Sequence, residues 1–287
     1  MDGRPRVVQC SLLGGRYEPR LAWRERALCR IAAYCGPPLA LHRFLLEPPH
    51  GLIQQAHAPR ETVSATVNAD GVGVGWLAPD GRPAVYRSPL PAWADPNLPA
   101  LGRSLTSGLW CGSVRSATDP LSNGYANTQP FSDEHRLFLH NGYLEGFASR
   151  LRGPIRRWLE PEIEAQIAGT TDSEYLFAVV RQALARHGDA AAALRAAVAR
   201  IDGWLHELGG AALLNLVLAG EGGIVALRYA YRHECPSLYF HPAHPGYAGG
   251  ALVASEAFDG DPGWQGVGPG ELLVMEAATH ETRLEPL

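Results

Sequence analysis

The apolar positions of the chain form several short runs typical of strands and two long runs with helical spacing. From residue 29 the run CRIAAYCG is almost entirely apolar, which predicts a strand that ends at Gly36-Pro37-Pro38. Residues 1–27 follow neither period. We therefore expect the ordered domain to begin at residue 29.

The first half of this domain shows one short helix and several strands. Residues 39–47 (LALHRFLLE) predict a helix that stops before Pro48-Pro49. Residues 72–87 alternate on either side of a turn signal, Asp80-Gly81, and so predict a β-hairpin. Two further strands are expected at residues 109–117 and 136–144.

The second half contains the two long helical patterns. They cover residues 170–188 and 189–210, and each ends in glycine, as helices commonly do. Residues 213–231 then predict two strands joined by a glycine turn, and shorter strands are expected at 251–255 and 272–276. Strands, then helices, then strands predict a layered α+β fold.

The composition is that of a globular protein without an obvious charged partner. Of the 287 residues, 46% are hydrophobic and 19% are charged, which is enough apolar material for a sizeable core. The net charge of −4 leaves no basic surplus for nucleic-acid phosphates, and no segment approaches the ~20 apolar residues that cross a bilayer. We expect neither nucleic acid nor a membrane as partner.

The chain has five cysteines, an odd number with irregular spacing and no CxxC pair. This is not the pattern of a secreted disulfide scaffold or of a zinc site. The first residues do not make a signal peptide either, because polar Gln9 and charged Arg16 and Glu18 interrupt the short apolar run. A cytoplasmic location is expected.

Five local patterns could carry chemistry. They are Cys29 at the start of its strand, NADGVGVGW (68–76), VRSAT (114–118), HNG (140–142) and GTTDSE (169–174). Each pattern taken alone also has a structural explanation, so residue type does not decide between them.

Three of these patterns can be explained by local structure. Asn141-Gly142 between apolar runs is the strongest short hairpin signal and predicts a type I′ turn. Thr171 and Glu174 are spaced as a helix capping box, which would make Asp172 an acid favoured by the helix dipole. Cys29 could be a small buried hydrophobic residue of its strand.

The remaining patterns have similar alternatives. Arg115 could form an ordinary surface ion pair, but it needs a partner if it is buried in its apolar surroundings. Gly71, Gly73 and Gly75 could simply allow close packing of a strand. They do not form a dinucleotide-binding fingerprint, because Trp76 stands where the third glycine would be.

His241 and His244 are two possible metal ligands. Pro242 and Pro245 prevent a helix from presenting them together, and no third ligand is evident in the sequence. We therefore expect no metal site.

In combination and in this order, the patterns are far more specific. The sequence resembles the class II glutamine amidotransferases, in particular the stand-alone branch of the ergothioneine-biosynthesis hydrolase EgtC, in the stretches CRIAAYCGPPLAL, EPPHGLIQQAHAPRE, NADGVGVGW, VRSAT, NTQPF, LFLHNGYLEGF, GTTDSE and SEAFDGDPGW. The resemblance covers residues 29–287. It implies an α+β fold, the four-layer αββα sandwich of the N-terminal-nucleophile hydrolases.

The resemblance also implies that Cys29 is the nucleophile and that its own α-amine is the general base. An α-amine has a pKa of about 8 and a thiol one of about 8.5, so proton transfer between them costs little near neutral pH. Family members stabilise the oxyanion with an asparagine side chain and the next glycine's N–H, which correspond to Asn141 and Gly142. Water would release the thioester without a metal or organic cofactor.

The same resemblance assigns the glutamyl end of the substrate. Its carboxylate would be held by Arg115 and its ammonium by Asp172, because the arginine fork suits a carboxylate and an acid suits an ammonium. Asn68 and Asp70 of the NADG motif are further candidates for substrate binding.

The sequence departs from that branch at its start. Members begin Met-Cys and expose the cysteine by losing the methionine, whereas here residues 1–28 precede Cys29. We expect this segment to be an unstructured or spurious extension, and residues 29–287 to be the amidotransferase-type domain. Either the chain is cleaved after Leu28, or translation begins at position 28 on a leucine codon. The complete absence of lysine, typical of high-GC coding sequence, favours the second.

The branch predicts a small-molecule substrate, γ-glutamyl-hercynylcysteine S-oxide, which would be hydrolysed to hercynylcysteine S-oxide and glutamate. Glutathione-like γ-glutamyl peptides are one alternative, because the residues named above would recognise only the glutamyl end. A protein that binds γ-glutamyl ligands or docks a partner is another, if Cys29 is not exposed. Leaving-group contacts are expected from Trp76 or residues 122–129, and no oligomeric state is predicted.

Overall fold

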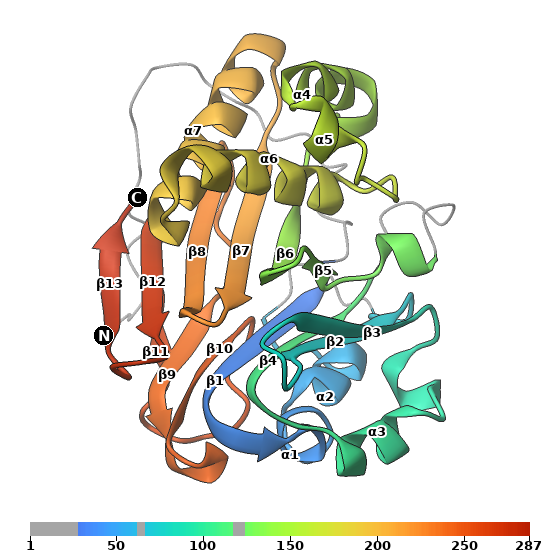
Figure 1. Cartoon of the computed structure of the whole chain (residues 1–287), viewed down its shortest axis with the longest axis vertical. Helices are drawn as coiled ribbons and strands as arrows, with labels where there is room; N and C mark the ends of the chain where they lie inside the picture. Colours follow the sequence, from blue (N-terminus) through green and yellow to red (C-terminus); the bar gives the residue numbers. More distant parts are fainter. Residues whose placement is uncertain (1–27, 62–66, 117–123) are drawn as a thin grey trace, which may run out of the picture.

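Figure 1 shows the computed structural model of the chain, which describes residues 28–61, 67–116 and 124–287. The described strands form two antiparallel sheets. The first has seven strands in the order β11 (Gln265–Gly266), β9 (Tyr239–His244), β10 (Gly250–Ala254), β1 (Arg30–Ala40), β4 (Thr106–Val114), β2 (Val72–Leu77) and β3 (Pro83–Ser88). The second has six strands in the order β13 (Thr282–Pro286), β12 (Glu271–Glu276), β8 (Gly223–Tyr231), β7 (Ala212–Gly220), β6 (Arg136–Leu144) and β5 (Phe131–Ser132).

The helices fall into two groups along the chain. The first group is α1 (Leu41–Leu45), α2 (Leu52–His57) and α3 (Leu98–Ser104). The second is α4 (Arg152–Trp158), α5 (Pro161–Glu164), α6 (Asp172–His187) and α7 (Ala190–Leu208). Short 3₁₀ turns are η2 (Ala92–Ala94), η4 (Tyr125–Asn127) and η6 (Pro245–Tyr247), and η5 (Phe147–Leu151) is a π-helical turn.

Alternating side chains place β1 between two apolar layers. Ile31, Ala33 and Cys35 point into a core shared with the second sheet. Ala32 and Tyr34, the residues between them, belong to a separate core under the first group of helices. Because successive side chains of a strand point to opposite faces, this pattern buries both faces of the first sheet.

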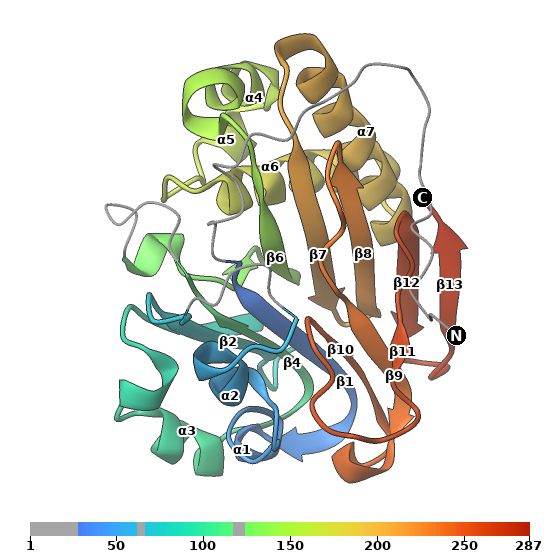
Figure 2. The same ribbon diagram turned by 180° about the vertical axis from the view of Figure 1, so that it is seen from behind.

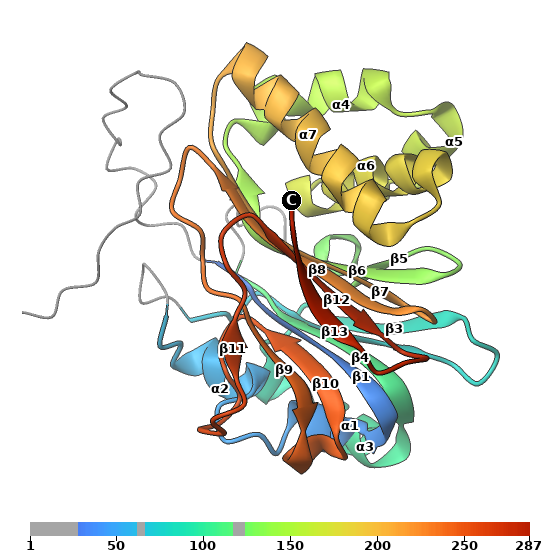
Figure 3. The ribbon, with the colours of Figure 1, turned by 90° about the vertical axis from the view of Figure 1, so that its left-hand side faces the viewer.

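The second group of helices covers the outer face of the second sheet. Phe138 of β6 stacks on Phe177 of α6, with ring centroids 5.1 Å apart. Leu137 and Leu139, the neighbours of Phe138, point instead into the core between the sheets. Seen edge-on in Figure 3, the order is helices, sheet, sheet, helices. The expected four-layer αββα sandwich is therefore confirmed.

Both long helices lie where their sequence patterns predict, and α6 begins with the expected cap. The Thr171 hydroxyl accepts a hydrogen bond from the backbone amide of Glu174 at 3.4 Å. The Glu174 carboxylate does not complete a capping box, because it accepts from the backbone amides of Ala168 and Gly169 at 2.8 and 2.6 Å. It thus closes the loop that leads into the helix.

The β1 strand is longer than the sequence predicts, so its expected end was wrong. It continues past Gly36-Pro37-Pro38 to Ala40. Between Cys35 and Leu39 its pairing with β4 shifts register, which places the two prolines in a β-bulge. A bulge leaves residues unpaired, so the missing proline N–H groups cost no ladder hydrogen bonds there.

Asn141 and Gly142 do not form a turn, which corrects the hairpin prediction. They lie inside β6, opposite Asn215 and Leu214 of β7. Gly142 has a φ of +157°, and a Cβ atom built on it would lie 1.8 Å from the carbonyl oxygen of Leu213. Glycine is needed here because the β7 backbone approaches so closely.

The other predicted elements are present: helix α1, the β2–β3 hairpin and strands β4, β7, β8, β10 and β12. The sequence pattern missed helices α2–α5 and strands β5, β9, β11 and β13. Within the described part of the chain, no helix is long and apolar enough to span a bilayer.

Candidate active site

The start of β1, the end of β4, strand β6 and the first turn of α6 meet at one cavity. Figures 1 and 2 show the start of β1 beside β6 from opposite sides. The cavity has a volume of about 350 Å³, which suits a small ligand. It is lined by Cys29, Arg115, Ser116, Asn127, Gln129, Gly142, Tyr143, Leu144, Gly146, Phe147, Ala148, Ser149, Arg152, Thr170, Thr171, Asp172 and Ser173.

Cys29 immediately precedes β1 and presents its thiol to this cavity. The S–H group donates to the carbonyl oxygen of Ser116 across 3.8 Å, and the side chain is half-buried. Burial raises the pKa of the thiol; the Arg115 guanidinium opposes this effect and the Asp172 carboxylate adds to it. A thiol with a raised pKa needs a base before it can act as a nucleophile.

Arg115 and Asp172 reach the cavity from the two halves of the sandwich. Arg115 follows β4 and is buried, and its Nη1 donates to the carbonyl oxygen of Asp70 at 3.5 Å. Asp172 opens α6, and its carboxylate accepts from the backbone amides of Leu144 and Ser173 at 2.7 and 2.8 Å. The cavity therefore holds a fixed cation and a fixed anion near the thiol.

The two candidate oxyanion donors are neighbours in β6. Gly142 lines the cavity, whereas Asn141 is buried and does not contribute to the cavity wall. The Asn141 Nδ2 donates to the hydroxyl of Ser255 at 3.2 Å. An amide nitrogen carries two hydrogens, so a second N–H of Asn141 remains for another acceptor.

Neither Asn68 nor Asp70 lies on the cavity wall. The backbone amide of Asn68 donates to the carbonyl oxygen of Ala56 at 2.8 Å, and the Asn68 side chain is buried. The Asp70 amide donates to the Arg115 carbonyl oxygen at 3.0 Å. The backbone of Asp70 thus holds Arg115 through both its amide and its carbonyl group.

Only some of the residues expected to contact the leaving group line the cavity. Trp76 does not line the cavity, because it packs against Trp110 under the first group of helices, with ring centroids 6.1 Å apart. In the predicted loop, residues 122–123 lie outside the described residues, whereas Asn127 and Gln129 line the cavity.

His140 ties β6 to the first turn of α6, a role that the sequence did not reveal. Its Nε2 donates to the carbonyl oxygen of Leu213 at 2.9 Å, so its Nδ1 is free of hydrogen and accepts from the Ser173 hydroxyl at 2.9 Å. Burial lowers the pKa of His140, which keeps this arrangement neutral. Gln129 pairs with the amide and carbonyl groups of the same residue at 2.5 and 2.8 Å.

Leu28, the residue before Cys29, is also buried. It packs with Tyr143 and Leu213 in a small apolar cluster, and Tyr143 lines the cavity. Residues 1–27, the rest of the expected extension, lie outside the described residues.

His241 and His244 do meet a third possible metal ligand, Asp261, which the sequence did not show. Their hydrogen bonds argue against a metal. The His241 Nδ1 accepts from the Ala243 amide at 3.3 Å, so its Nε2 carries the proton and donates to Asp261 at 2.9 Å. His244 is held in the same way by the Gly246 amide and an aspartate. A metal-bound imidazole instead donates its other N–H group.

The other described cysteines lie away from the cavity. Cys35 and Cys111 are buried between the sheets, where burial raises the pKa of both thiols, and Cys235 lies in the loop before β9. A larger hollow of about 720 Å³ includes the turn between β7 and β8, and its described wall has no cysteine, serine or threonine. Of these two hollows, only the smaller one has a cysteine in its described wall.

The αββα sandwich is the fold of the N-terminal-nucleophile hydrolases. Residues 54–235 match the family model of class II glutamine amidotransferases. A γ-glutamyl-hercynylcysteine sulfoxide hydrolase of Mycolicibacterium smegmatis is 30% identical, over 88% of this chain and 97% of that protein. One of Mycobacterium tuberculosis is 31% identical, over 83% of this chain and 88% of that protein. The chain belongs to the class II glutamine amidotransferases and is an enzyme of the amide-hydrolysing kind.

Solved structures agree with this assignment. A glutamine aminotransferase class-II domain protein from Silicibacter pomeroyi superposes with a TM-score of 0.65 at 26% identity, over 90% of this chain and 99% of that one. The glutamine phosphoribosylpyrophosphate amidotransferase of Bacillus subtilis shares the fold, with a TM-score of 0.54 at 18% identity over 90% of this chain and 49% of that one.

Proposed function

We propose that the protein hydrolyses a γ-glutamyl amide bond with the thiol of Cys29, and that its substrate is γ-glutamyl-hercynylcysteine S-oxide. The observation that carries the proposal is the convergence of Cys29, Arg115, Gly142 and Asp172 on one cavity. These residues come from separate elements, and each has the chemistry that one part of a γ-glutamyl amide requires.

The charges in the cavity match the glutamyl end of such a substrate. The Arg115 guanidinium would bind the α-carboxylate, and the Asp172 carboxylate would bind the α-ammonium. Both groups are held by backbone hydrogen bonds, so they are oriented before the substrate arrives. We assign Asn68 and Asp70 to the binding of the same end, and the backbone of Asp70 supports Arg115 there.

The reaction proceeds in two steps. The α-amine of Cys29 takes the thiol proton, and the thiolate attacks the γ-carbonyl carbon. The Asn141 Nδ2 and the Gly142 N–H stabilise the oxyanion, and one such donor is typically worth about 3 kcal/mol. The C–N bond then breaks, the leaving amine takes the proton from the Cys29 ammonium, and a γ-glutamyl thioester remains. Water, deprotonated by the amine, releases glutamate.

This mechanism requires a free α-amine, so we assign the active form to a chain that begins at Cys29. Cleavage after Leu28 would produce it, as would initiation at position 28 followed by loss of the initiator methionine. Removal of Leu28 would also uncover the apolar surface of Tyr143 and Leu213. Because Tyr143 lines the cavity, this surface becomes available to the leaving group.

The leaving group of the proposed substrate is a cysteine derivative with a carboxylate next to the amide nitrogen. Arg152 lines the cavity with an exposed side chain, and its guanidinium suits such a carboxylate. Both mycobacterial relatives are named for this substrate. These observations favour it over γ-glutamyl amides whose leaving group has no carboxylate.

Glutamate release by chains that begin at Met1 and at Cys29 tests the proposal. We expect the Cys29 form alone to release glutamate, faster from γ-glutamyl-hercynylcysteine S-oxide than from glutathione. The Cys29→Ala variant should be inactive and the Cys235→Ala variant unchanged, because Cys235 lies outside the cavity. Faster release of glutamate from glutathione would contradict the proposed substrate but would support the proposed hydrolysis by Cys29. A folded Cys29 form that hydrolyses neither compound would contradict the proposal.

The buried position of Leu28 favours one second candidate, a protein that binds γ-glutamyl ligands without turnover while Cys29 stays inside the chain. Tight binding of both compounds by the longer and the shorter form, with no glutamate released by either, would identify that function.

A further inference from the structure

Ser255 and Glu256 follow β10 and lie next to the residues that follow Cys29. Both are buried, with 1% of their surface exposed. The β10 strand pairs with β1, and the Ser255 amide continues this ladder by donating to the carbonyl oxygen of Ile31 at 2.9 Å. Two polar side chains from a distant part of the sequence thus reach the buried edge of the site.

The Ser255 hydroxyl connects the two sheets at the candidate oxyanion donor. Its oxygen accepts from the Ile31 amide of β1 at 3.1 Å and from the Asn141 Nδ2 of β6 at 3.2 Å. The second bond fixes the rotation of the Asn141 amide. Asn215, opposite Asn141 in β7, does not compete, because its Nδ2 donates to the Ser237 carbonyl oxygen at 2.8 Å.

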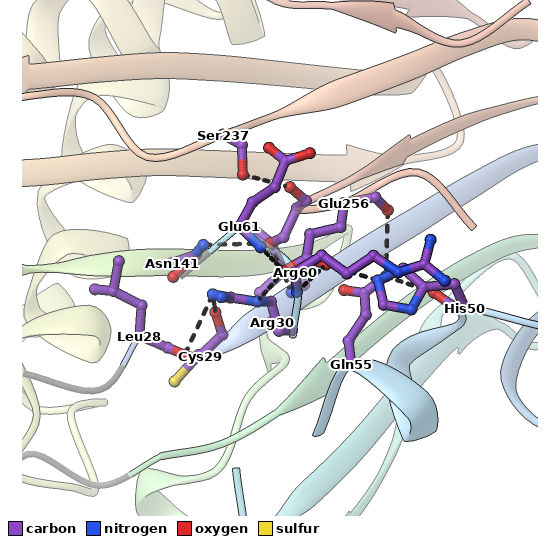
Figure 4. A network of polar contacts seen from close by, with 12 residues as sticks. Leu28, Cys29, Arg30, His50, Gln55, Arg60, Glu61, Asn141, Ser237 and Glu256 are labelled. Atoms are coloured by element: carbon purple, nitrogen blue, oxygen red, sulfur yellow. Dashed lines mark hydrogen bonds and ion pairs between the residues drawn. The ribbon is translucent and has the colours of Figure 1, made fainter. Parts of the chain in front are cut away.

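The Glu256 carboxylate acts on the backbone of Cys29 through Arg30. Its Oε1 accepts from the Arg30 Nε at 3.1 Å, and the Arg30 Nη1 donates to the carbonyl oxygens of Cys29 and Leu28 at 3.2 and 3.5 Å. Figure 4 shows this chain of contacts from Glu256 to Cys29.

The same carboxylate is held from its other side, which makes it a rigid anchor. Its Oε2 meets the His50 Nε2 at 2.7 Å and the Arg60 amide at 2.9 Å, and its Oε1 accepts from the Glu61 amide at 3.1 Å. Burial alone would raise the pKa of Glu256, but these hydrogen bonds and the Arg30 charge outweigh it and hold that pKa below its ordinary range. The group is therefore a charged acceptor at neutral pH.

We propose that Ser255 and Glu256 are positioning residues for the reaction on Cys29. Ser255 orients the Asn141 amide toward the oxyanion, and Glu256 fixes the Cys29 backbone, and with it the α-amine and thiol, through Arg30. This inference rests on the proposed function of the cavity. Neither residue of this Ser-Glu pair, which belongs to the stretch SEAFDGDPGW, lines the cavity. Each would therefore act through a neighbouring residue and not through contact with the substrate.

Kinetics of the Ser255→Ala variant, in the chain that begins at Cys29, test the proposed role of Ser255. We expect kcat to fall about 10- to 100-fold with an unchanged KM, less than the loss of a whole oxyanion donor. The rate of Cys29 alkylation by iodoacetamide should stay unchanged, because that reaction forms no oxyanion. Ser255→Thr keeps the hydroxyl and should recover most of kcat.

Ser237→Ala is the matched control. The Ser237 hydroxyl donates to the carbonyl oxygen of Ser255 at 2.9 Å, so this change removes a hydrogen bond to the same residue without touching Asn141. We expect kcat near that of the unmodified chain. In an Asn141→Ala background, Ser255→Ala should cost little more, because Ser255 acts through that amide.

The Glu256→Gln and Arg30→Gln variants test the proposed role of Glu256. Each should lower kcat, and the double variant should be no slower than the slower single variant, because both residues act on the same carbonyl group. Additive losses of kcat in the double variant would overturn this role of Glu256.

Two results separate the possible failures. An active unmodified chain whose Ser255→Ala variant matches Ser237→Ala in kcat would refute this inference alone, as would a Ser255→Ala variant that loses alkylation rate and kcat together. An unmodified chain that begins at Cys29, is folded and releases no glutamate would refute the proposed function and this inference with it.

Discussion

Burial and the charges around Cys29 shift the pKa of its thiol in opposite directions. Burial raises its pKa and the Asp172 carboxylate adds to that effect, whereas the guanidinium groups of Arg115 and Arg30 lower it. Burial prevails, so the thiol stays protonated at neutral pH unless a base removes the proton. In the proposed mechanism the α-amine of the same residue is that base, and its ordinary pKa of about 8 suits the task.

The pH dependence of Cys29 alkylation should show this balance. In the chain that retains Leu28 no ammonium neighbours the thiol, and a raised pKa moves thiolate formation to higher pH. The midpoint of iodoacetamide alkylation should therefore lie above the ~8.5 of an ordinary cysteine. In the form that begins at Cys29, the ammonium stabilises the thiolate and the midpoint should fall.

Mass spectrometry of the Cys29 peptide at each pH measures these rates, and the Cys29→Ala variant corrects for alkylation elsewhere. A midpoint at or below ~8.5 in the longer chain would show that the cations around Cys29 outweigh its burial.

Among the elements, β6 has the most demanding geometry. It pairs with β7 along its whole length, carries both candidate oxyanion donors and receives the Asp172 carboxylate at the Leu144 amide. This close pairing requires glycine at position 142, because the Leu213 carbonyl group of β7 occupies the space where a Cβ atom would stand.

Gly142→Ala should damage both stability and activity. Relief of the contact with Leu213 would shift the β6 backbone, which we expect to cost about 1–3 kcal/mol of unfolding free energy. The displaced N–H should lower kcat by more than about tenfold. Urea unfolding and glutamate release measure the two effects.

Gly203→Ala in α7 is the control for that change. No atom lies within 4 Å of its Cβ position, and alanine favours a helix by up to about 1 kcal/mol, so this variant should be at least as stable as the unmodified chain. Equal stability and activity of the Gly142→Ala variant would mean that β6 tolerates a side chain there.

Periodic patterns predicted α6, α7 and the long strands because these elements bury continuous apolar faces in the three cores. Elements such as α2 and β11 are too short for a period to show, so tertiary contacts define them. The Asn141-Gly142 pair misled the hairpin prediction because a close strand approach and a tight turn both select glycine, and only the pairing partner distinguishes them.

Across the whole molecule, the site lies where the two sheets meet. Cys29 and Arg115 flank strands β1 and β4 of the first sheet, whereas Gly142 lies in the second sheet and Asp172 begins a helix that covers it. The packing of the core between the sheets therefore sets the distance between Cys29 and the groups proposed to recognise the substrate.

The sequence motifs indicated which residues would gather, but not how the support behind them is built. Asn68 and Asp70 were expected at the substrate, but neither lines the cavity, and Asp70 contacts Arg115 through its backbone. Ser255 and Glu256 could not be placed from local pattern, because only the pairing of β10 with β1 brings them to the site.

In the proposed mechanism Cys29, as the first residue of the active chain, forms a γ-glutamyl thioester. To test this step, the chain that begins at Cys29 is mixed with γ-glutamyl-hercynylcysteine S-oxide and the reaction is quenched in acid within one turnover. The mass of the N-terminal peptide is then measured by mass spectrometry. We predict the mass of one γ-glutamyl group on the peptide that begins at Cys29, its disappearance on longer incubation and its absence from Cys29→Ala. Glutamate release without this adduct, or an adduct on another residue, would contradict the claim.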